Sequence, residues 1–203
     1  MKASVWKDVR SKNLWRIREV ERFVFPYDYA TPDRCSATDD RICEFFIKQL
    51  RESKSKVFNI IQLMFERHIK GLESYESLRT DIDIFSDEVK ARHCEWKDVD
   101  PQWVEKIIEV DLELIRGTQE LLAVLHEIYS AVVEYKKIRL IDHAALVYEP
   151  NIEKKLTRYA HGVRVMVGDL ARTFKERDMV CNLKKLEMRK TFDRIRQMAG
   201  ERV

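Results

Sequence analysis

The stretch from Asp100 to Tyr148 restricts the possible folds of this chain more than any other. It opens with an Asp-Pro pair and then contains no further proline until Pro150. Its apolar side chains return every three or four positions, which is the period of an α-helix. Asp100 can accept hydrogen bonds from the first backbone N–H groups of a helix, and Pro101 suits a position that needs no N–H donor. The sequence therefore predicts one long helix here, covered by the rest of the chain.

Two apolar seams run along this predicted helix. The first consists of Ile107, Val110, Leu114, Leu121, Val124 and Ile128. The second consists of Val104, Ile108, Ile115, Leu122 and Leu125. A helix with a single neighbour needs only one narrow stripe, so two seams predict neighbours on two sides. The second neighbour can come from the same chain or from another copy, which makes the second seam a candidate homodimer interface.

Periodic apolar residues also predict a first helix over 4–24, a second over about 37–89 and a last over about 152–198. Within the second, Gly71 is a candidate kink. The sequence Ser36-Ala37-Thr38-Asp39 has the pattern of a capping box with Asp in place of Glu, which predicts that the second helix starts there.

The segment 25–33 contains two prolines and two aspartates, which predicts a loop. We expect its aromatic residues Phe25, Tyr27 and Tyr29 to anchor this loop onto the core. Nearby, the sequence Trp-Lys-Asp-Val at 6–9 recurs at 96–99. The recurrence fits either a decayed duplication or chance, and the proline-containing loop has no counterpart in the second copy.

Only 5 glycines and 4 prolines occur in 203 residues, which favours long helices with short connections over a turn-rich β protein. Three long helices joined by short loops run up and down beside one another. The sequence therefore predicts an all-α, elongated up-and-down bundle of three long helices plus a short N-terminal helix. Residues 1–36 supply the N-terminal helix and the loop that packs on the bundle, and residues 37–203 form the bundle, in a single domain overall.

No motif in the chain predicts catalysis. None of the five histidines follows a glutamate at the spacing of a di-metal helix, and no HExxH zinc motif occurs. His93-Cys94 lacks a second ligand pair for zinc, and the five glycines are isolated rather than gathered in a phosphate loop. We expect a protein that is not an enzyme, with no catalytic residues, cofactor or metal.

Charge is distributed unevenly along the chain. Residues 37–133 carry 13 basic and 20 acidic side chains, whereas residues 134–203 carry 17 basic and 10 acidic ones. The basic third can complement the acidic helices, or it can face phosphate or anionic lipid. Three long helices with excess Lys and Arg resemble BAR-type membrane-curving dimers in their proportions. The resemblance is one of architecture alone, because no residue motif supports it. The candidate lipid or phosphate contacts are Lys136, Lys137, Arg139, Lys154, Lys155 and Arg158.

The remaining features concern location and partners. The four cysteines include no CxxC pair, the N-terminus has no apolar run like that of a signal peptide, and no window approaches the ~20 apolar residues of a membrane span. We expect a cytoplasmic protein. Nucleic acid is an unlikely partner because Glu187 and Asp193 interrupt the C-terminal basic cluster. The sequence predicts a non-enzymatic scaffold or adaptor that binds protein partners, as a homodimer or in a complex; the alternative is a BAR-like dimer on anionic membranes.

Overall fold

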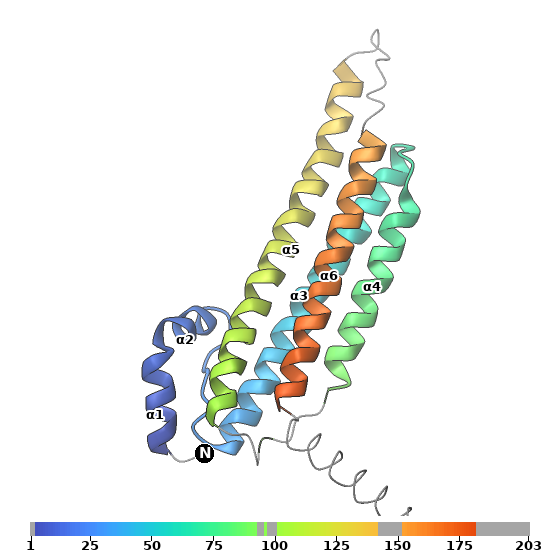
Figure 1. Cartoon of the computed structure of the whole chain (residues 1–203). Coiled ribbons are helices and arrows are strands. Elements are labelled where there is room, and N and C mark those ends of the chain that lie inside the picture. The colour runs from blue at the N-terminus through green and yellow to red at the C-terminus, as the bar shows by residue number, and fades with distance from the viewer. Residues whose placement is uncertain (1–2, 93–95, 97–100, 142–151, 182–203) are drawn as a thin grey trace, which may run out of the picture. The chain divides into compact units, whose positions relative to one another are not determined.

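The computed structural model describes residues 3–92, Trp96, 101–141 and 152–181 (Figure 1). Within these ranges the regular structure consists of six helices and no strand. The helices are α1 (Ala3–Lys12), α2 (Leu14–Glu21), α3 (Pro32–Glu66), α4 (Leu72–Lys90), α5 (Pro101–Ile141) and α6 (Ile152–Cys181). The predicted all-α bundle of long helices is confirmed, and α5 begins at the predicted proline.

The chain forms two compact units. The first consists of Met1–Ile42, Arg92–Glu113 and Thr173–Val203, and the second of Cys43–Ala91 and Leu114–Arg172. Helices α3, α5 and α6 each contribute residues to both units. The predicted single domain, with its N-terminal part ending at residue 36, stays a prediction.

In the second unit, parts of four helices pack against one another (Figure 1). Lys54 of α3 forms an ion pair with Asp83 of α4, and Asp81 of α4 forms one with Arg164 of α6. Gln119 of α5 donates a hydrogen bond to Gln49 of α3. These pairings make α3 a neighbour of α4 and of α5, and α4 a neighbour of α6. The core between them contains Val57, Ile60, Met64, Tyr75, Leu78, Ile82, Leu121, Leu125, Ile128, Leu156, Val163 and Val167.

The prediction of one helix over 37–89 is wrong, because the chain reverses at residues 67–71 to give the antiparallel helices α3 and α4. Gly71 adopts a left-handed backbone with φ of 96°, a conformation in which only glycine is unstrained. A Cβ at Gly71 would lie 3.1 Å from Oγ1 of Thr157, so the turn also passes close to α6. Gly71 therefore ends one helix and starts another rather than kinking a continuous one.

The N-terminal region also differs from the prediction in detail. The expected helix over 4–24 is two helices, α1 and α2, divided at the buried Asn13, whose side-chain amide donates to the carbonyl oxygen of Val9. Helix α3 starts at Pro32 rather than at Ser36. Thr38 and Asp39 consequently lie inside α3 and do not cap it. The Thr38 hydroxyl instead donates to the carbonyl oxygen of Asp28, which ties the preceding loop to the helix.

Candidate functional site

The loop between α2 and α3 is held on the first unit by two tyrosines. The hydroxyl groups of Tyr27 and Tyr29 both donate to Oδ2 of Asp111 on α5, at 2.7 Å and 3.0 Å. All three side chains are buried. The expected anchoring of this loop by its aromatic residues is confirmed for the two tyrosines. It is wrong for Phe25, which is 74% exposed.

Asp111 is also part of a buried network of ion pairs. Arg177 of α6 pairs with Asp111 and, at 2.5 Å, with Asp39 of α3. Arg92, which follows α4, pairs with Asp39 at 2.6 Å and with Asp178 at 3.0 Å. The two arginines offset the charges of the buried Asp39 and Asp111, which is the condition under which charges are tolerated in a protein interior. The third carboxylate, Asp178, is 41% exposed. The network thus connects α3, α5, α6 and the loop into one body.

Aromatic rings pack around this network. Trp6 of α1 and Trp96 both lie against Tyr29, with ring centroids 6.0 Å and 5.2 Å away. These tryptophans are the first residues of the two Trp-Lys-Asp-Val copies. Each copy of the recurrent motif therefore contributes one tryptophan ring that packs on Tyr29. The choice between duplication and chance stays open.

The protonation of the network is fixed by its surroundings. Burial raises the pKa of Tyr27 and of Tyr29 well above the ordinary value, and the negative charge of Asp111 raises it further. Burial alone would raise the pKa of Asp39, but the guanidinium groups of Arg177 and Arg92 together lower it. At neutral pH the tyrosines stay protonated donors and Asp39 stays a charged acceptor. This arrangement suits mechanical support better than proton transfer, which needs groups whose pKa lies near the working pH.

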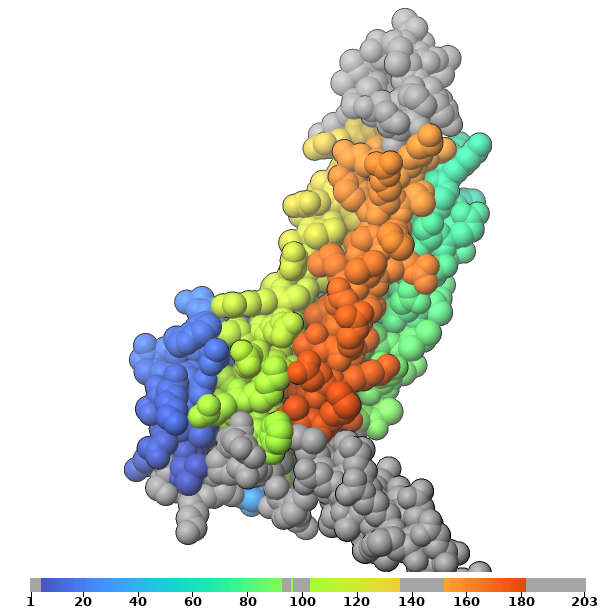
Figure 2. Space-filling view, viewed as in Figure 1, coloured from blue at the N-terminus to red at the C-terminus, as the bar shows by residue number. Residues whose placement is uncertain are grey.

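The N-terminal segment, blue in Figure 2, contains several apolar side chains that are exposed to solvent. On α2, Ile17 and Val20 are buried, whereas Leu14 and Trp15 are exposed, with Trp15 at 54%. The guanidinium group of Arg16 lies 5.1 Å from the centre of the Trp15 ring. Phe23 and Phe25, which follow α2, are exposed as well. We call Leu14, Trp15, Phe23 and Phe25 the aromatic surface.

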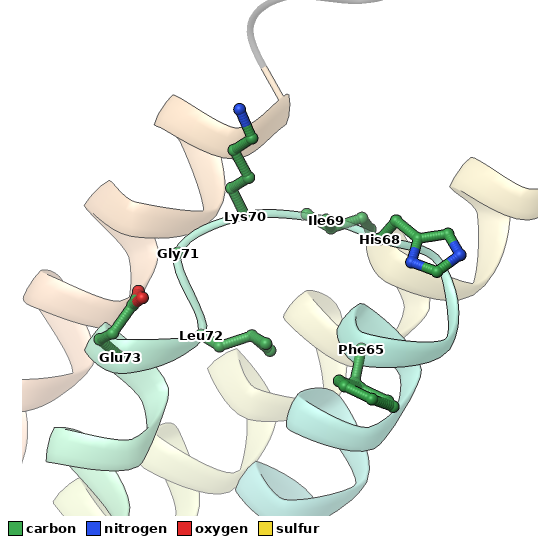
Figure 3. A pocket seen from close by; sticks show the side chains of 7 residues that line it. All are labelled: Phe65, His68, Ile69, Lys70, Gly71, Leu72 and Glu73. Carbon is green, nitrogen blue, oxygen red and sulfur yellow. The ribbon is translucent and has the colours of Figure 1, made fainter.

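A second exposed region lies in the second unit, where the α3–α4 turn meets the start of α6. We call residues 65–73 and 153–159 the hairpin end. The backbone N–H of Lys70 donates to the carboxylate of Glu153 at 3.2 Å. An open hollow beside this contact is lined by Lys70, Gly71, Glu153, Lys154, Thr157 and Arg158. A neighbouring hollow is lined by Phe65, His68, Ile69, Lys70, Gly71, Leu72 and Glu73 (Figure 3).

Three of the predicted lipid or phosphate contacts, Lys154, Lys155 and Arg158, are exposed at the hairpin end. The other three, Lys136, Lys137 and Arg139, belong to α5, but their side chains lie outside the described part of the chain. The structure adds Lys70, which sequence reasoning missed because the turn that brings it to α6 was not predicted.

The candidate dimer seam is mostly covered within one chain. Val104, Ile108, Ile115 and Leu125 are buried, and Leu122 is half-buried. These side chains therefore belong to the core and do not form a free surface. Homo-oligomerisation itself stays a prediction.

No group of three or more His, Cys, Asp or Glu side chains among the described residues is placed to hold a metal ion. No helix in the described ranges combines the length and apolar character needed to cross a membrane. Neither a known protein family, nor a curated protein, nor a solved structure matches this chain.

Proposed function

We propose that this chain is a non-enzymatic helical module that binds a protein partner through the aromatic surface. The observation that carries the proposal is the exposure of Leu14, Trp15, Phe23 and Phe25 within one short segment. Burying such side chains against a partner supplies the hydrophobic free energy that drives most protein–protein association. Tryptophan and arginine are also the residues that most often dominate binding energy at protein interfaces. Trp15 with Arg16 stacked on it has this composition.

The anchoring of the segment supports the same function. Tyr27 and Tyr29 fasten the chain to Asp111 just after Phe25. A segment that is already ordered loses less conformational freedom on binding, so more of the contact energy appears as affinity. The buried network then acts as the support of a recognition surface.

The charges around the aromatic surface indicate the chemistry of the partner. Arg18 of α2 and Arg22, the residue after α2, are exposed, and Arg22 is bridged to Glu19 at 3.0 Å. Arg16 lies 3.7 Å from Glu109 of α5. A partner with an apolar groove and carboxylates at its rim would complement this combination.

The experiment compares partner capture by three forms of the full chain. The wild type and Ile84→Ala should retain the same proteins, because Ile84 is an exposed apolar residue of α4 in the other unit. Trp15→Ala/Phe25→Ala should lose them. With the purified partner, the double variant should bind at least about 30-fold more weakly, which corresponds to one hot-spot side chain of about 2 kcal/mol.

Equal binding of the partner by a folded Trp15→Ala/Phe25→Ala protein would contradict the proposal. Circular dichroism and melting temperature establish that the variant is folded.

Two further measurements test the other parts of the proposal. Light scattering of the wild type checks whether the module acts as a homodimer. Imaging of the tagged chain in its own cells checks the cytoplasmic location that we include in the proposal. A BAR-like dimer is less well supported, since most of the candidate dimer seam is buried in one chain.

A further inference from the structure

The hairpin end combines positive charge with protruding aromatic rings, independently of the aromatic surface and of the function proposed for it. Four exposed cations come from two segments far apart in sequence: Lys70 from the turn, and Lys154, Lys155 and Arg158 from the start of α6. The hydrogen bond from the backbone N–H of Lys70 to the carboxylate of Glu153 joins these segments. The cations therefore share one end of the second unit.

Carboxylates at the same end reduce this charge without cancelling it. Glu66 and Glu73 are exposed, and Glu153 is half-buried and accepts the hydrogen bond from the turn. Arg67 adds a further cation, although its guanidinium group donates to the carbonyl oxygen of Val132 on α5. The balance of charge at the hairpin end remains positive.

Two exposed aromatic rings lie at the same end of the second unit. Phe65, at the end of α3, is 71% exposed. Tyr159 is also exposed, and the ammonium group of Lys155 lies 5.7 Å from the centre of its ring. In Figure 3, the side chain of Leu72 lies on the same side of the turn as Phe65. The side chain of Lys70 points to the opposite side. Aromatic residues flanked by Lys and Arg suit the boundary between lipid headgroups and acyl chains.

We propose that the hairpin end docks onto an anionic lipid surface, with the four cations on the headgroups and Phe65 inserted between them. A single soluble phosphate could use the cations lining the hollow, but it would leave the phenyl ring of Phe65 in water. The fourth cation, Lys155, does not line that hollow and lies against the ring of Tyr159 instead. Both features fit an extended negative surface better than a small anion.

Co-sedimentation of the full chain with vesicles tests this proposal. Vesicles of phosphatidylcholine with about a third phosphatidylserine should bind the wild type, and pure phosphatidylcholine vesicles should not. Raising the salt concentration should weaken the binding, because surface charges are screened. Lys154→Gln/Lys155→Gln/Arg158→Gln should weaken it about a hundred-fold, at the usual contribution of each cation near an anionic membrane. Phe65→Ala should weaken it about ten-fold and leave its salt dependence unchanged.

The matched control is Lys48→Gln/Arg51→Gln/Arg172→Gln, which removes three exposed cations of the same unit away from the hairpin end. It should bind vesicles within about three-fold of the wild type. Equal losses in the two triple variants would show a general effect of net charge and overturn the proposal, as would absence of salt-sensitive binding by the wild type. Saturable binding of inorganic phosphate without vesicle binding would overturn it in favour of a soluble anion. Trp15→Ala/Phe25→Ala should bind vesicles normally, so failure of either proposal leaves the other standing.

Discussion

Arg177 and Asp111 form an ion pair whose two side chains are both completely shielded from solvent. Removing two charges from water costs several kcal/mol each, and such a pair persists only where further hydrogen bonds complete it. Here Tyr27 and Tyr29 donate to Asp111, and Asp39 accepts from Arg177. Misplacing any one of these elements would leave a charge buried without its partner. The network therefore favours one arrangement of α3, α5, α6 and the loop.

Replacing Arg177 by methionine should lower the free energy of unfolding by about 3–5 kcal/mol, because it leaves Asp111 buried without its counter-charge. Urea unfolding followed by circular dichroism measures this change. Arg172→Met is the control, since the Arg172 side chain is 81% exposed in its ion pair with Asp169 and should change the value by less than about 1 kcal/mol. A loss below about 1 kcal/mol for Arg177→Met would show that the network contributes little to the fold.

Tyr27→Phe should lower the free energy of unfolding by about 1.5–3 kcal/mol, because it removes a hydrogen bond donated to a buried carboxylate. Phe25→Ala, two residues away, should have a far smaller effect, because its ring is mostly in solvent. Thermal and urea unfolding of the two variants separate anchoring from surface exposure along the same loop. Equal losses would mean that Phe25 is also part of the anchor.

The stability of the chain should fall in acid partly through Asp39. Its pKa is lower in the folded protein than in the unfolded chain, where it is about 3.9, so its charged form stabilises the fold. That contribution is complete above about pH 5 and is lost as the pH falls through the folded pKa. Melting temperatures from pH 7 to pH 3 should therefore drop less steeply for Asp39→Asn than for the wild type. Parallel curves would contradict this assignment.

Long apolar periodicity made the helical class and the start of α5 predictable. The turn at 67–71 was hidden because the apolar pattern resumes at Leu72 and Tyr75, so the break leaves little trace in the period. A single glycine is weak evidence for a reversal, since isolated glycines are tolerated within helices. Contacts of the turn with α6, such as the hydrogen bond from Lys70 to Glu153, arise only after folding.

The buried network was not predicted, because its ion pairs join residues as much as 138 positions apart. A signal was nevertheless present. Asp111 lies among the apolar residues of α5, and Arg177 lies one turn from Phe174 and from Cys181 in the apolar stripe of α6. A charge at a position where the period requires an apolar side chain is evidence of a buried partner. Which partner it meets depends on packing between helices that local sequence does not encode.

The glycines offer a last test, in which the same substitution should have opposite effects at two positions. Gly71→Ala should lower the free energy of unfolding by at least about 1 kcal/mol, because alanine is strained at a φ of 96° and its Cβ would approach Thr157. Gly168→Ala should raise it by up to about 1 kcal/mol, because the site is helical, nothing lies within 4 Å of the new Cβ, and alanine is the better helix former. Urea unfolding of both variants compares them directly. A stabilising Gly71→Ala would mean that Gly71 itself is not held in the left-handed conformation.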